Sequence, residues 1–221
     1  MEKRVKDSLY EQVARIGKAA SSPKRLELLE LLCQGEKTVD TLAREAAISM
    51  KLASAHLREL RAARLVDTER QGKNIIYRLA SGGVAEFWVT LRALAEERLV
   101  ELQMALRQMT LDPEHLAPRD RASLEKAARK GELVVLDVRP AAEYEAAHLP
   151  HARSLPLGEL KARLAELPRD KTIVAYCRGP YCLMARDAVV LLRKKGFEAL
   201  HLHDGVAEWG LAPVRTPSRQ A

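Results

Sequence analysis

Apolar positions in the first part of the chain recur every three or four residues, which is the spacing of amphipathic helices. Thr38 and Ser49 each precede such a stretch, and both residue types favour the N-cap position of a helix. Pro23 suits the first turn of a helix, and Gly35 suits the position just after its end. The pattern predicts helices over residues 6–19, from Pro23 to near Gly35, over 39–47 and over 50–64.

Residues 65–70 and 74–79 are typical of strands, and Gln71-Gly72-Lys73 between them predicts a hairpin with a basic tip. A long helix is then expected over residues 83–109. This helix has more apolar positions than one small domain needs to cover. We therefore predict that a homodimer forms through the 83–109 helix.

The second half of the chain alternates short apolar runs with helical patterns. The segment 110–118 has two prolines in six residues and no helical period, and it is the expected linker. The later alternation is typical of a parallel α/β sheet. Strands are expected over 133–137, 172–176 and 198–202, and helices over 121–130, over 183–195 and from Gly205.

The predicted fold class is therefore α+β overall. A mostly α-helical domain with a β-hairpin wing occupies residues 1–109, a linker follows at 110–118, and an α/β domain with a central parallel sheet occupies 119–221.

Charge narrows the class of partner. The chain has 221 residues and a net charge of +7, and between Lys51 and Arg78 seven basic residues stand against three acidic ones. A basic surface of this kind favours a polyanionic partner. The first residues have no apolar core of a signal peptide, and no apolar run reaches the ~20 residues that span a bilayer. Three cysteines are too few for a disulfide framework, so we expect a cytoplasmic protein without a membrane partner.

The order helix, turn, helix and β-hairpin is that of a winged helix-turn-helix, whose second helix enters the major groove of DNA. A double-stranded DNA operator is the predicted partner. His56 has an alternative interpretation as a half-buried helix residue. The predicted DNA-binding residues are Ser49, Lys51, Ser54, His56 and Arg58 on that helix, and Arg70, Lys73 and Arg78 on the wing.

An ordered series of motifs in the first hundred residues resembles the ArsR family of dimeric bacterial repressors. The matching pieces are residues 18–29 (KAASSPKRLELL), 41–43 (TLA), 54–60 (SAHLREL), 65–66 (LV), 72–73 (GK) and 77–79 (YRL). The resemblance implies a homodimer on a palindromic operator.

Metal-sensing members of that family carry Cys-x-Cys in the third helix or Asp/His clusters in the last one. Residues 39–47 have neither Cys nor His, and residues 83–109 have no His, so no metal is predicted. Ala55 stands where a basic residue is common, which reduces the expected contacts to bases. Cys33, beside a helix end, is interpreted as a packing residue, with a sensing role as the alternative.

Cys177 carries the chemistry of the second half. It follows a buried strand and opens a loop that leads into a helix, and ligands of open α/β sheets collect at such strand ends. Backbone N–H groups and the helix dipole are expected to lower the pKa of the thiol. The predicted catalytic residues are Cys177, Arg178 and Cys182, and the loop between them holds Gly179, Pro180 and Tyr181.

Residues 119–213 resemble rhodaneses. The matching pieces are residues 136–139 (LDVR), 143–144 (EY), 148–152 (HLPHA), 174–177 (VAYC) and 205–209 (GVAEW). The resemblance implies transfer of sulfane sulfur through a persulfide on Cys177. It assigns Asp137 and Arg139 a supporting role at the strand end. His148 and His151 are expected to pack in loops and turns.

Two positions of the loop depart from that family. Pro180 replaces a common glycine, and Cys182 replaces a common basic residue, which argues against thiosulfate as the preferred donor. Cys182 adds a second thiol that can resolve a persulfide into a disulfide or polysulfide bridge. A phosphatase loop needs an Arg where Leu183 stands, so that activity is excluded.

Three functions remain open. One is a transcriptional repressor whose Cys177 receives sulfane sulfur or senses reactive sulfur or oxidants. Another is a sulfurtransferase whose DNA-binding half serves only location or dimerisation. The third is a redox switch that forms a Cys177–Cys182 disulfide without sulfur transfer. A small sulfur-containing donor or acceptor is the expected second partner, and no cofactor is expected.

Overall fold

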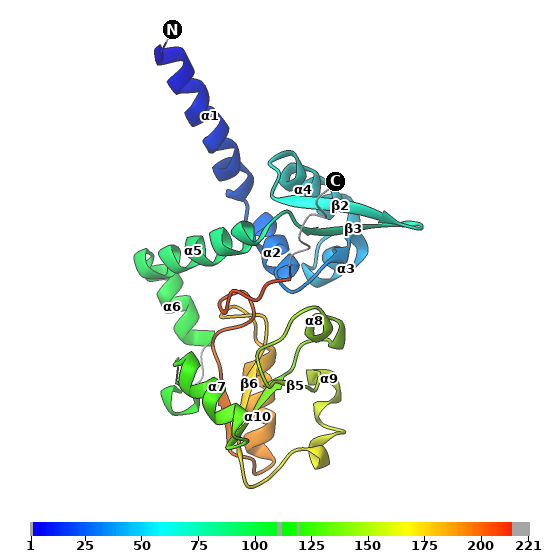
Figure 1. Cartoon of the computed structure of the whole chain (residues 1–221), viewed down its shortest axis with the longest axis vertical. Coiled ribbons are helices and arrows are strands. Elements are labelled where there is room, and N and C mark those ends of the chain that lie inside the picture. Colours follow the sequence, from blue (N-terminus) through cyan, green and yellow to red (C-terminus); the bar gives the residue numbers. More distant parts are fainter. Residues whose placement is uncertain (1, 110–111, 119, 214–221) are drawn as a thin grey trace. The chain divides into compact units, whose positions relative to one another are not determined.

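The computed structural model describes residues 2–109, 112–118 and 120–213 (Figure 1). Its contacts divide the chain into two compact units, of which the first extends to Trp88 and the second runs from Val89 to Ala212. Within the described residues, no helix combines the length and apolarity that a bilayer-crossing segment needs.

Four helices of the first unit match those expected from the sequence. They are α1 (Glu2–Ala20), α2 (Pro23–Leu32), α3 (Val39–Glu45) and α4 (Met50–Ala62). The predicted caps are confirmed, because the Thr38 side chain accepts the N–H of Thr41 and the Ser49 side chain accepts that of Leu52. Apolar side chains on the inner faces make one core, which includes Leu28, Leu29, Leu32, Leu42, Leu57 and Leu60.

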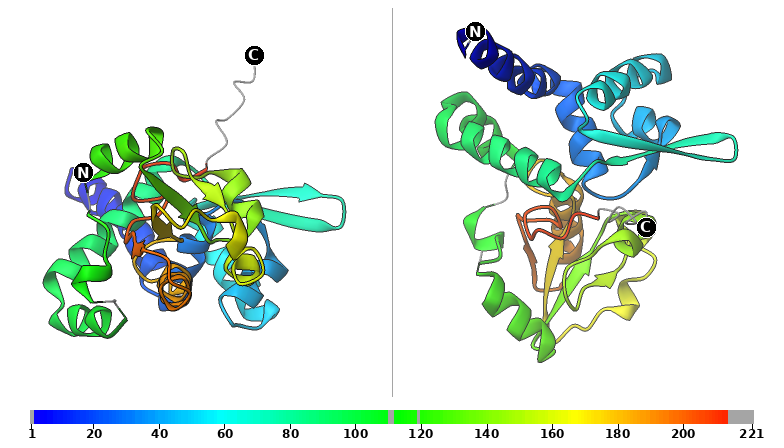
Figure 2. Two further views of the ribbon diagram at one scale, coloured as in Figure 1. Left: turned by 90° about the horizontal axis from the view of Figure 1, so that it is seen from below. Right: turned by 45° about the horizontal axis from the view of Figure 1, so that its top comes forward.

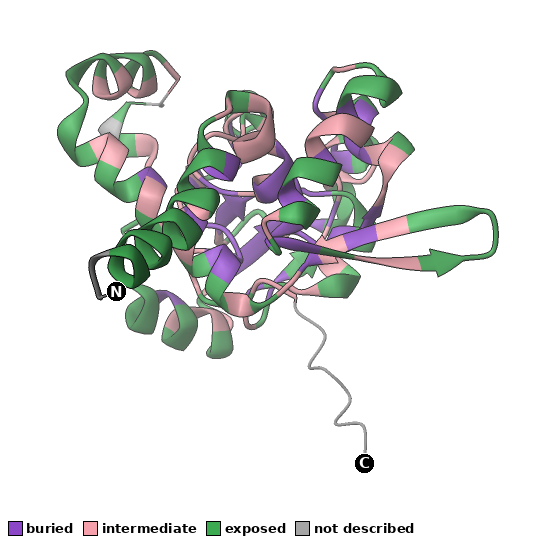
Figure 3. Ribbon diagram, turned by 90° about the horizontal axis from the view of Figure 1, so that it is seen from above, coloured by how far each residue is buried: buried purple, intermediate pink, exposed green. Residues whose placement is uncertain are grey.

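A three-stranded antiparallel sheet completes this unit. Its strands are β1 (Lys37–Thr38), β2 (Val66–Gln71) and β3 (Asn74–Leu79), in the order β1-β3-β2. Gln71 pairs with Asn74, and Gly72 takes the left-handed φ of +60° that the tight turn requires. The β2–β3 hairpin extends away from the helices (Figure 2), and its tip is exposed (Figure 3). This hairpin is the predicted wing.

The prediction of a single long helix over residues 83–109 is wrong. The structure has two helices there, α5 (Gly82–Arg98) and α6 (Val100–Met109), and the chain turns at Leu99 (Figure 1). The Gln103 side-chain amide donates to the carbonyls of Glu96 (2.8 Å) and Glu97 (3.1 Å). These are carbonyls at the end of α5, where a helix leaves its last acceptors without intrahelical donors.

The second unit contains a parallel sheet in the order β5-β4-β6-β7. Its strands are β4 (Leu133–Asp137), β5 (Arg153–Ser154), β6 (Thr172–Tyr176) and β7 (Ala199–His201). Helix α10 (Met184–Lys194) packs on one face with Ala185, Val189 and Leu192, and α7 (Arg121–Arg129) covers the other with Leu124. The short helices α8 (Ala141–Ala146) and α9 (Leu157–Leu160) and the 3-10 turns η1 (Pro113–His115) and η2 (Leu164–Glu166) complete it.

The predicted fold class is confirmed in both halves. The prediction of a helix from Gly205 is wrong, because residues 206–210 form turns. The turns end at Gly210, whose φ is +70°. Residues 110 and 111 of the expected linker lie outside the described residues. Further along the linker, the N–H of Ala117 donates to the carbonyl of His201, the last residue of β7, at 2.9 Å. The domain limits 1–109, 110–118 and 119–221 stay a prediction.

A buried polar network joins the carboxyl ends of the central strands β4 and β6. Arg139 donates from Nη2 to Asp137 Oδ2 (2.6 Å) and from Nε to Oδ1 (3.0 Å), and both side chains are fully buried. The Tyr176 hydroxyl donates to the same carboxylate and accepts the N–H of Leu149. Burial raises the pKa of Tyr176, so its hydroxyl stays a donor at all physiological pH values.

Arg139→Met tests how far the second unit depends on this network. The substitution leaves the Asp137 carboxylate buried without its cation, which typically costs about 3–5 kcal/mol. We expect the free energy of unfolding of the second unit to fall by that amount, measured by hydrogen exchange of the β6 amides in a urea series. Arg163→Met, which removes two exposed ion pairs, is the control and leaves the exchange unchanged. Equal stability of the two variants would contradict the prediction.

Candidate functional site

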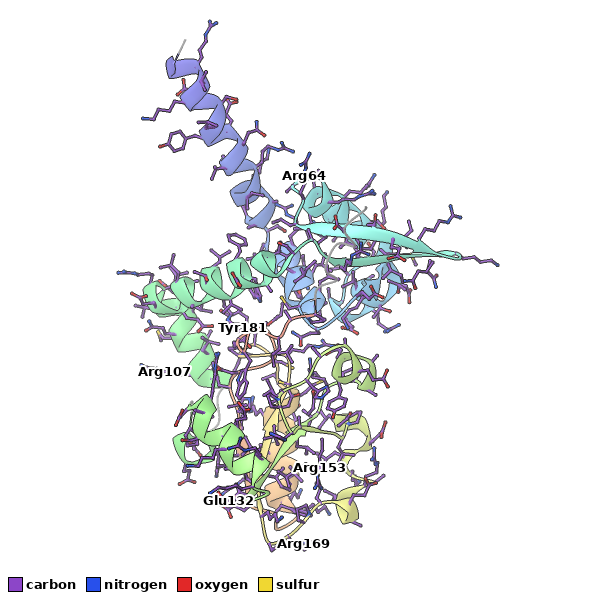
Figure 4. The ribbon with its side chains drawn as sticks, viewed as in Figure 1. Arg64, Arg107, Glu132, Arg153, Arg169 and Tyr181 are labelled. Atoms are coloured by element: carbon purple, nitrogen blue, oxygen red, sulfur yellow. The ribbon has the colours of Figure 1, made fainter. Side chains whose placement is uncertain are left out.

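The loop from Cys177 to Cys182 lies at the carboxyl end of the sheet. Cys177 follows β6 directly and is 1% exposed. Gly179 has a φ of +140°, which favours glycine, and its carbonyl accepts the N–H of Cys182 at 3.1 Å. Figure 4 shows Tyr181 of the loop at the end of this unit opposite to Glu132 and Arg169, which precede strands β4 and β6. The loop therefore occupies the strand end that the sequence predicted.

The two loop thiols form an interacting pair. The Sγ of Cys177 donates to the Cys182 carbonyl at 3.2 Å, and Cys182 is partly exposed while Cys177 is buried. A hydrogen bond from the Cys177 thiol lowers the pKa of Cys182 to about 7. Burial raises the pKa of Cys177 well above its ordinary value, and the Cys182 charge adds to that shift. The pair therefore loses its first proton at Cys182.

The opposite pKa shifts of the two thiols correct the expectation that the loop lowers the pKa of Cys177. The N–H groups of Ala185 and Gly179 do favour its thiolate, but burial has the larger effect. The backbone N–H groups of Arg178 and Met184 act on Cys182 instead. The Cys182 thiolate is therefore the neighbour of a Cys177 thiol that keeps its proton.

Arg178 pairs with a carboxylate that sequence reasoning gave no role. Its Nη2 lies 2.6 Å and its Nε 3.1 Å from Oε1 of Glu143, whose side chain is 3% exposed. Glu143 belongs to α8, so the ion pair fixes the loop against that helix. The residue lies in the quoted EY motif, but 35 positions separate it from Arg178 and no local pattern links them. The catalytic role of Arg178 stays a prediction.

The supporting residues of the site lie directly under the loop. Asp137 and Arg139 belong to the buried network that includes Tyr176, the residue before Cys177. Gly205 approaches the loop from beyond β7, since a Cβ placed on it would lie 2.7 Å from the Cys177 carbonyl oxygen. Only glycine permits this approach. His148 stacks on Tyr144 with ring centroids 4.0 Å apart, and His151 takes a turn conformation with φ +61°.

The predicted DNA-binding residues of the recognition helix α4 differ in their exposure to solvent. Ser49, Lys51 and Arg58 are exposed, and Ser54 and His56 are half-buried. Arg58 donates from Nε to the Ser54 carbonyl at 3.4 Å. The opposite face holds Ala53, Leu57 and Leu60 in the core, so the two faces of α4 separate as a DNA-reading helix requires.

The three predicted basic residues of the wing differ in exposure and in ion pairing. Arg70 and Lys73 are exposed near the tip, and Arg70 donates to the Gly72 carbonyl at 3.2 Å. Arg78 forms a 3.1 Å ion pair with Glu69 across the hairpin, which offsets its charge. Exposed positive charge on the wing is therefore concentrated at Arg70 and Lys73.

Two other features lie apart from the loop. Cys33 is fully buried at the end of α2, in the first unit. Asp112, Glu114 and His115 form the one group of three possible metal-binding side chains among the described residues, with ligand atoms within 4.8 Å of one another. Asp112 and Glu114 are exposed, and such surface groups are common without an ion, so we assign no metal site there.

Comparisons with known proteins match both halves of the chain. Residues 22–68 match the bacterial regulatory proteins of the arsR family, and residues 120–212 match the rhodanese-like domain, as both resemblances predicted. HTH-type transcriptional regulator Rv0324 of Mycobacterium tuberculosis is 42% identical over 207 residues, which cover 94% of this chain and 91% of that protein. The probable adenylyltransferase/sulfurtransferase MoeZ of the same species is 31% identical over 97 residues, 42% of this chain and 24% of MoeZ.

A solved structure is similar to the first part of the chain. It is the solution NMR structure of a homodimeric winged helix-turn-helix DNA-binding domain, fragment 1-100 of Mb0332 from Mycobacterium bovis. The two are 38% identical, with coverage of 43% of this chain and 89% of that one and a TM-score of 0.41.

The pH dependence of thiol alkylation tests the coupled pair. In the wild type, we expect Cys182 to be alkylated with a midpoint near pH 7, with the rate rising as pH rises, and Cys177 to react only at higher pH. In Cys177→Ala the hydrogen bond to Cys182 is lost, so the Cys182 midpoint moves up towards its ordinary value. Mass spectrometry of peptides after short exposure to iodoacetamide measures both sites.

Fully buried Cys33 in the same sample is the internal control and is expected to stay unmodified in the folded protein. An unchanged Cys182 midpoint in Cys177→Ala, or alkylation of Cys177 before Cys182, would contradict the assignment.

Proposed function

Since the chain belongs to the ArsR family of bacterial transcriptional regulators and carries a rhodanese-like domain, we propose that it is a cytoplasmic repressor that senses reactive sulfur. When Cys177 receives sulfane sulfur, the affinity of the protein for DNA changes. The observation that carries the proposal is the paired thiols of Cys177 and Cys182 in one loop, with Cys177 Sγ 3.2 Å from the Cys182 carbonyl oxygen.

The DNA-binding form is a homodimer on a palindromic operator. The DNA-binding fragment 1-100 of Mb0332, which is 38% identical to the matching part of this chain, is homodimeric. Large apolar side chains are exposed along the 83–109 segment, on α5, on α6 and at the turn between them, namely Leu94, Leu99, Val100 and Met104. Helix α1 carries a second exposed row with Val5, Leu9, Tyr10 and Val13. Exposed rows of large apolar side chains are typical of an interface between copies.

In that dimer, α4 enters the major groove and the wing contacts the DNA backbone. Lys51, Ser54, His56 and Arg58 face the bases or the adjacent phosphates, and Ser49 places the helix start. Arg70 and Lys73 bind phosphates, because their charges are exposed at the wing tip. Arg78 contributes less, since Glu69 shares its charge.

The sulfur step balances with the two thiols and a hydropersulfide donor R–S–SH. Cys177 attacks the outer sulfur of the donor and releases R–S⁻, and its proton passes to the Cys182 thiolate as the new S–S bond forms. This leaves a persulfide on Cys177 and a thiol on Cys182. After Cys182 loses its proton to water, it attacks Sγ of Cys177, which forms a Cys177–Cys182 disulfide and releases HS⁻. The two cysteine thiols are oxidised and the sulfane sulfur is reduced to sulfide.

Sulfurtransferase activity is the second candidate. The backbone N–H groups of Gly179 and Ala185 point at Cys177 and stabilise an anionic sulfur there. MoeZ, which matches part of this chain, is named an adenylyltransferase/sulfurtransferase. In this function, a thiol or cyanide acceptor removes the sulfur from Cys177 in each cycle. Cys177→Ser abolishes such turnover, and a rate no higher than that of free thiol would exclude it.

Operator binding before and after polysulfide treatment tests the proposed sensor. The probe is a duplex selected by the untreated full-length protein from a random double-stranded DNA library. We expect the affinity of treated and untreated wild type to differ by at least about fivefold, a typical coupling between two sites. Intact mass of the treated protein identifies a persulfide or a disulfide.

Cys177→Ser is expected to bind the duplex equally well in both states, and Cys33→Ser is expected to behave as the wild type. Equal affinity of treated and untreated wild type would refute the sensor. A response to peroxide with a disulfide and no response to polysulfide would replace it by a redox switch.

Salt dependence tests the phosphate contacts of the wing. We expect Lys73→Ala to weaken binding of all DNA sequences alike and to reduce the slope of log K against log salt by about 1 per protomer, because one phosphate contact is lost. Lys126→Ala, on helix α7 of the second unit, is the matched control and keeps the slope. An unchanged slope in Lys73→Ala would remove the wing tip from the interface.

A further inference from the structure

A buried ion pair joins α5 to the turn after β7 within the second unit. Nη2 of Arg92 lies 2.9 Å from Oε1 of Glu208, and the two side chains are only 5% and 6% exposed. Nε of Arg92 also lies 3.2 Å from Oε1 of Glu96, one turn further along α5. Burial of such charges costs desolvation energy that the attraction often does not recover. The pair therefore needs an explanation other than stability.

The carboxylate of Glu208 contacts the backbone around the thiols. Its Oε2 accepts the N–H of Gly205 at 2.6 Å. Gly205 is the residue that lies against the Cys177 carbonyl, with space for no side chain between them. A Cβ placed on Gly179 would lie 3.1 Å from Oε2 of Glu208, so the same carboxylate also borders the loop.

Arg92 itself borders the same loop. Its Nη1 lies 3.5 Å from the position that a Cβ on Gly179 would take. Its guanidinium also stands over the ring of Tyr181, 5.6 Å from the ring centroid. Arg92 and Glu208 therefore border the loop between the two cysteines at Gly179 and Tyr181. The sequence did not single out Arg92, and it gave Glu208 no role beyond its place in the motif 205–209.

From these contacts we infer that Arg92 is a positioning residue through which helix α5 and the Cys177 loop fix one another. Closing a Cys177–Cys182 bond rearranges the four residues between the cysteines, including Gly179 and Tyr181, and so displaces the groups that surround Arg92. Helix α5 begins in the first unit at Gly82, and a change at Arg92 therefore acts on a helix that both units share. The DNA-binding part of this inference rests on the proposed sensor.

The experiment compares full-length variants that differ in this ion pair. Arg92→Gln breaks it, and Arg92→Gln with Glu208→Gln removes both of its charges, so Glu208 is not left as a buried carboxylate without its cation. The amide oxygen of Gln at 208 can still accept the N–H of Gly205. Arg163→Gln is the matched control, because Arg163 also pairs with two glutamates, Glu159 and Glu166, on an exposed surface.

Two quantities are measured for each protein: the iodoacetamide rate of Cys177 and the ratio of duplex affinities before and after polysulfide treatment. In both Arg92 variants, we expect the Cys177 rate to rise by about tenfold, because a looser loop opens the buried thiol more often. The affinity ratio is expected to fall to within about twofold of one, since the coupling between the sites is lost. Arg163→Gln is expected to match the wild type in both.

A Cys177 rate in both Arg92 variants equal to that of the wild type overturns the positioning role. A raised rate with the full wild-type affinity ratio overturns the link to DNA binding. If the wild type itself shows no affinity change with polysulfide, the proposed sensor fails, whereas the Cys177 rate still decides the role of Arg92. If Arg92→Gln alone does not fold, the double variant decides both questions.

Discussion

The second unit depends on one buried carboxylate. Asp137 ends β4, and it holds Arg139 after the same strand and the hydroxyl of Tyr176 at the end of β6. A fully buried carboxylate is tolerated only where its acceptor sites are filled, and here a guanidinium, a phenol and the backbone N–H of Arg139 fill them. These contacts fix where β6 ends. They therefore fix the position of Cys177, the next residue.

The loop beyond this point is held by charges from three directions. Glu143 holds Arg178 at the start of the loop, and Glu208 borders Gly179 while it binds the Gly205 N–H. Arg92 stands over Tyr181. Both cations, Arg178 and Arg92, pair with carboxylates, so the loop offers a sulfur anion mainly backbone N–H groups. The thiolate that forms first is at Cys182, because Cys177 is buried and donates to its neighbour.

The sequence predicted those features that depend on neighbouring residues in the chain. Thr38 and Ser49 cap helices because cap chemistry is local, and the strand before Cys177 follows from five consecutive apolar or β-forming residues. The turn at Leu99 was missed because the side chain of Gln103 folds back onto Glu96 and Glu97, which a periodicity does not reveal. The raised pKa of Cys177 was missed because it follows from packing by the whole core. The ion pairs Arg178–Glu143 and Arg92–Glu208 join residues far apart in the chain.

The geometry around Cys177 favours a sensing thiol over the nucleophile of a sulfurtransferase that turns over rapidly. A transferase needs open access for the donor and for an acceptor in every cycle, whereas Cys177 is 1% exposed. In the proposed sensor, the residue best placed to remove sulfur from Cys177 is Cys182, which is in the same loop, so the reaction that follows the proposed persulfide is intramolecular. That reaction ends in a covalent bond within the chain, which persists until a reductant breaks it. A state that persists after the donor has left can be read by a DNA-binding domain.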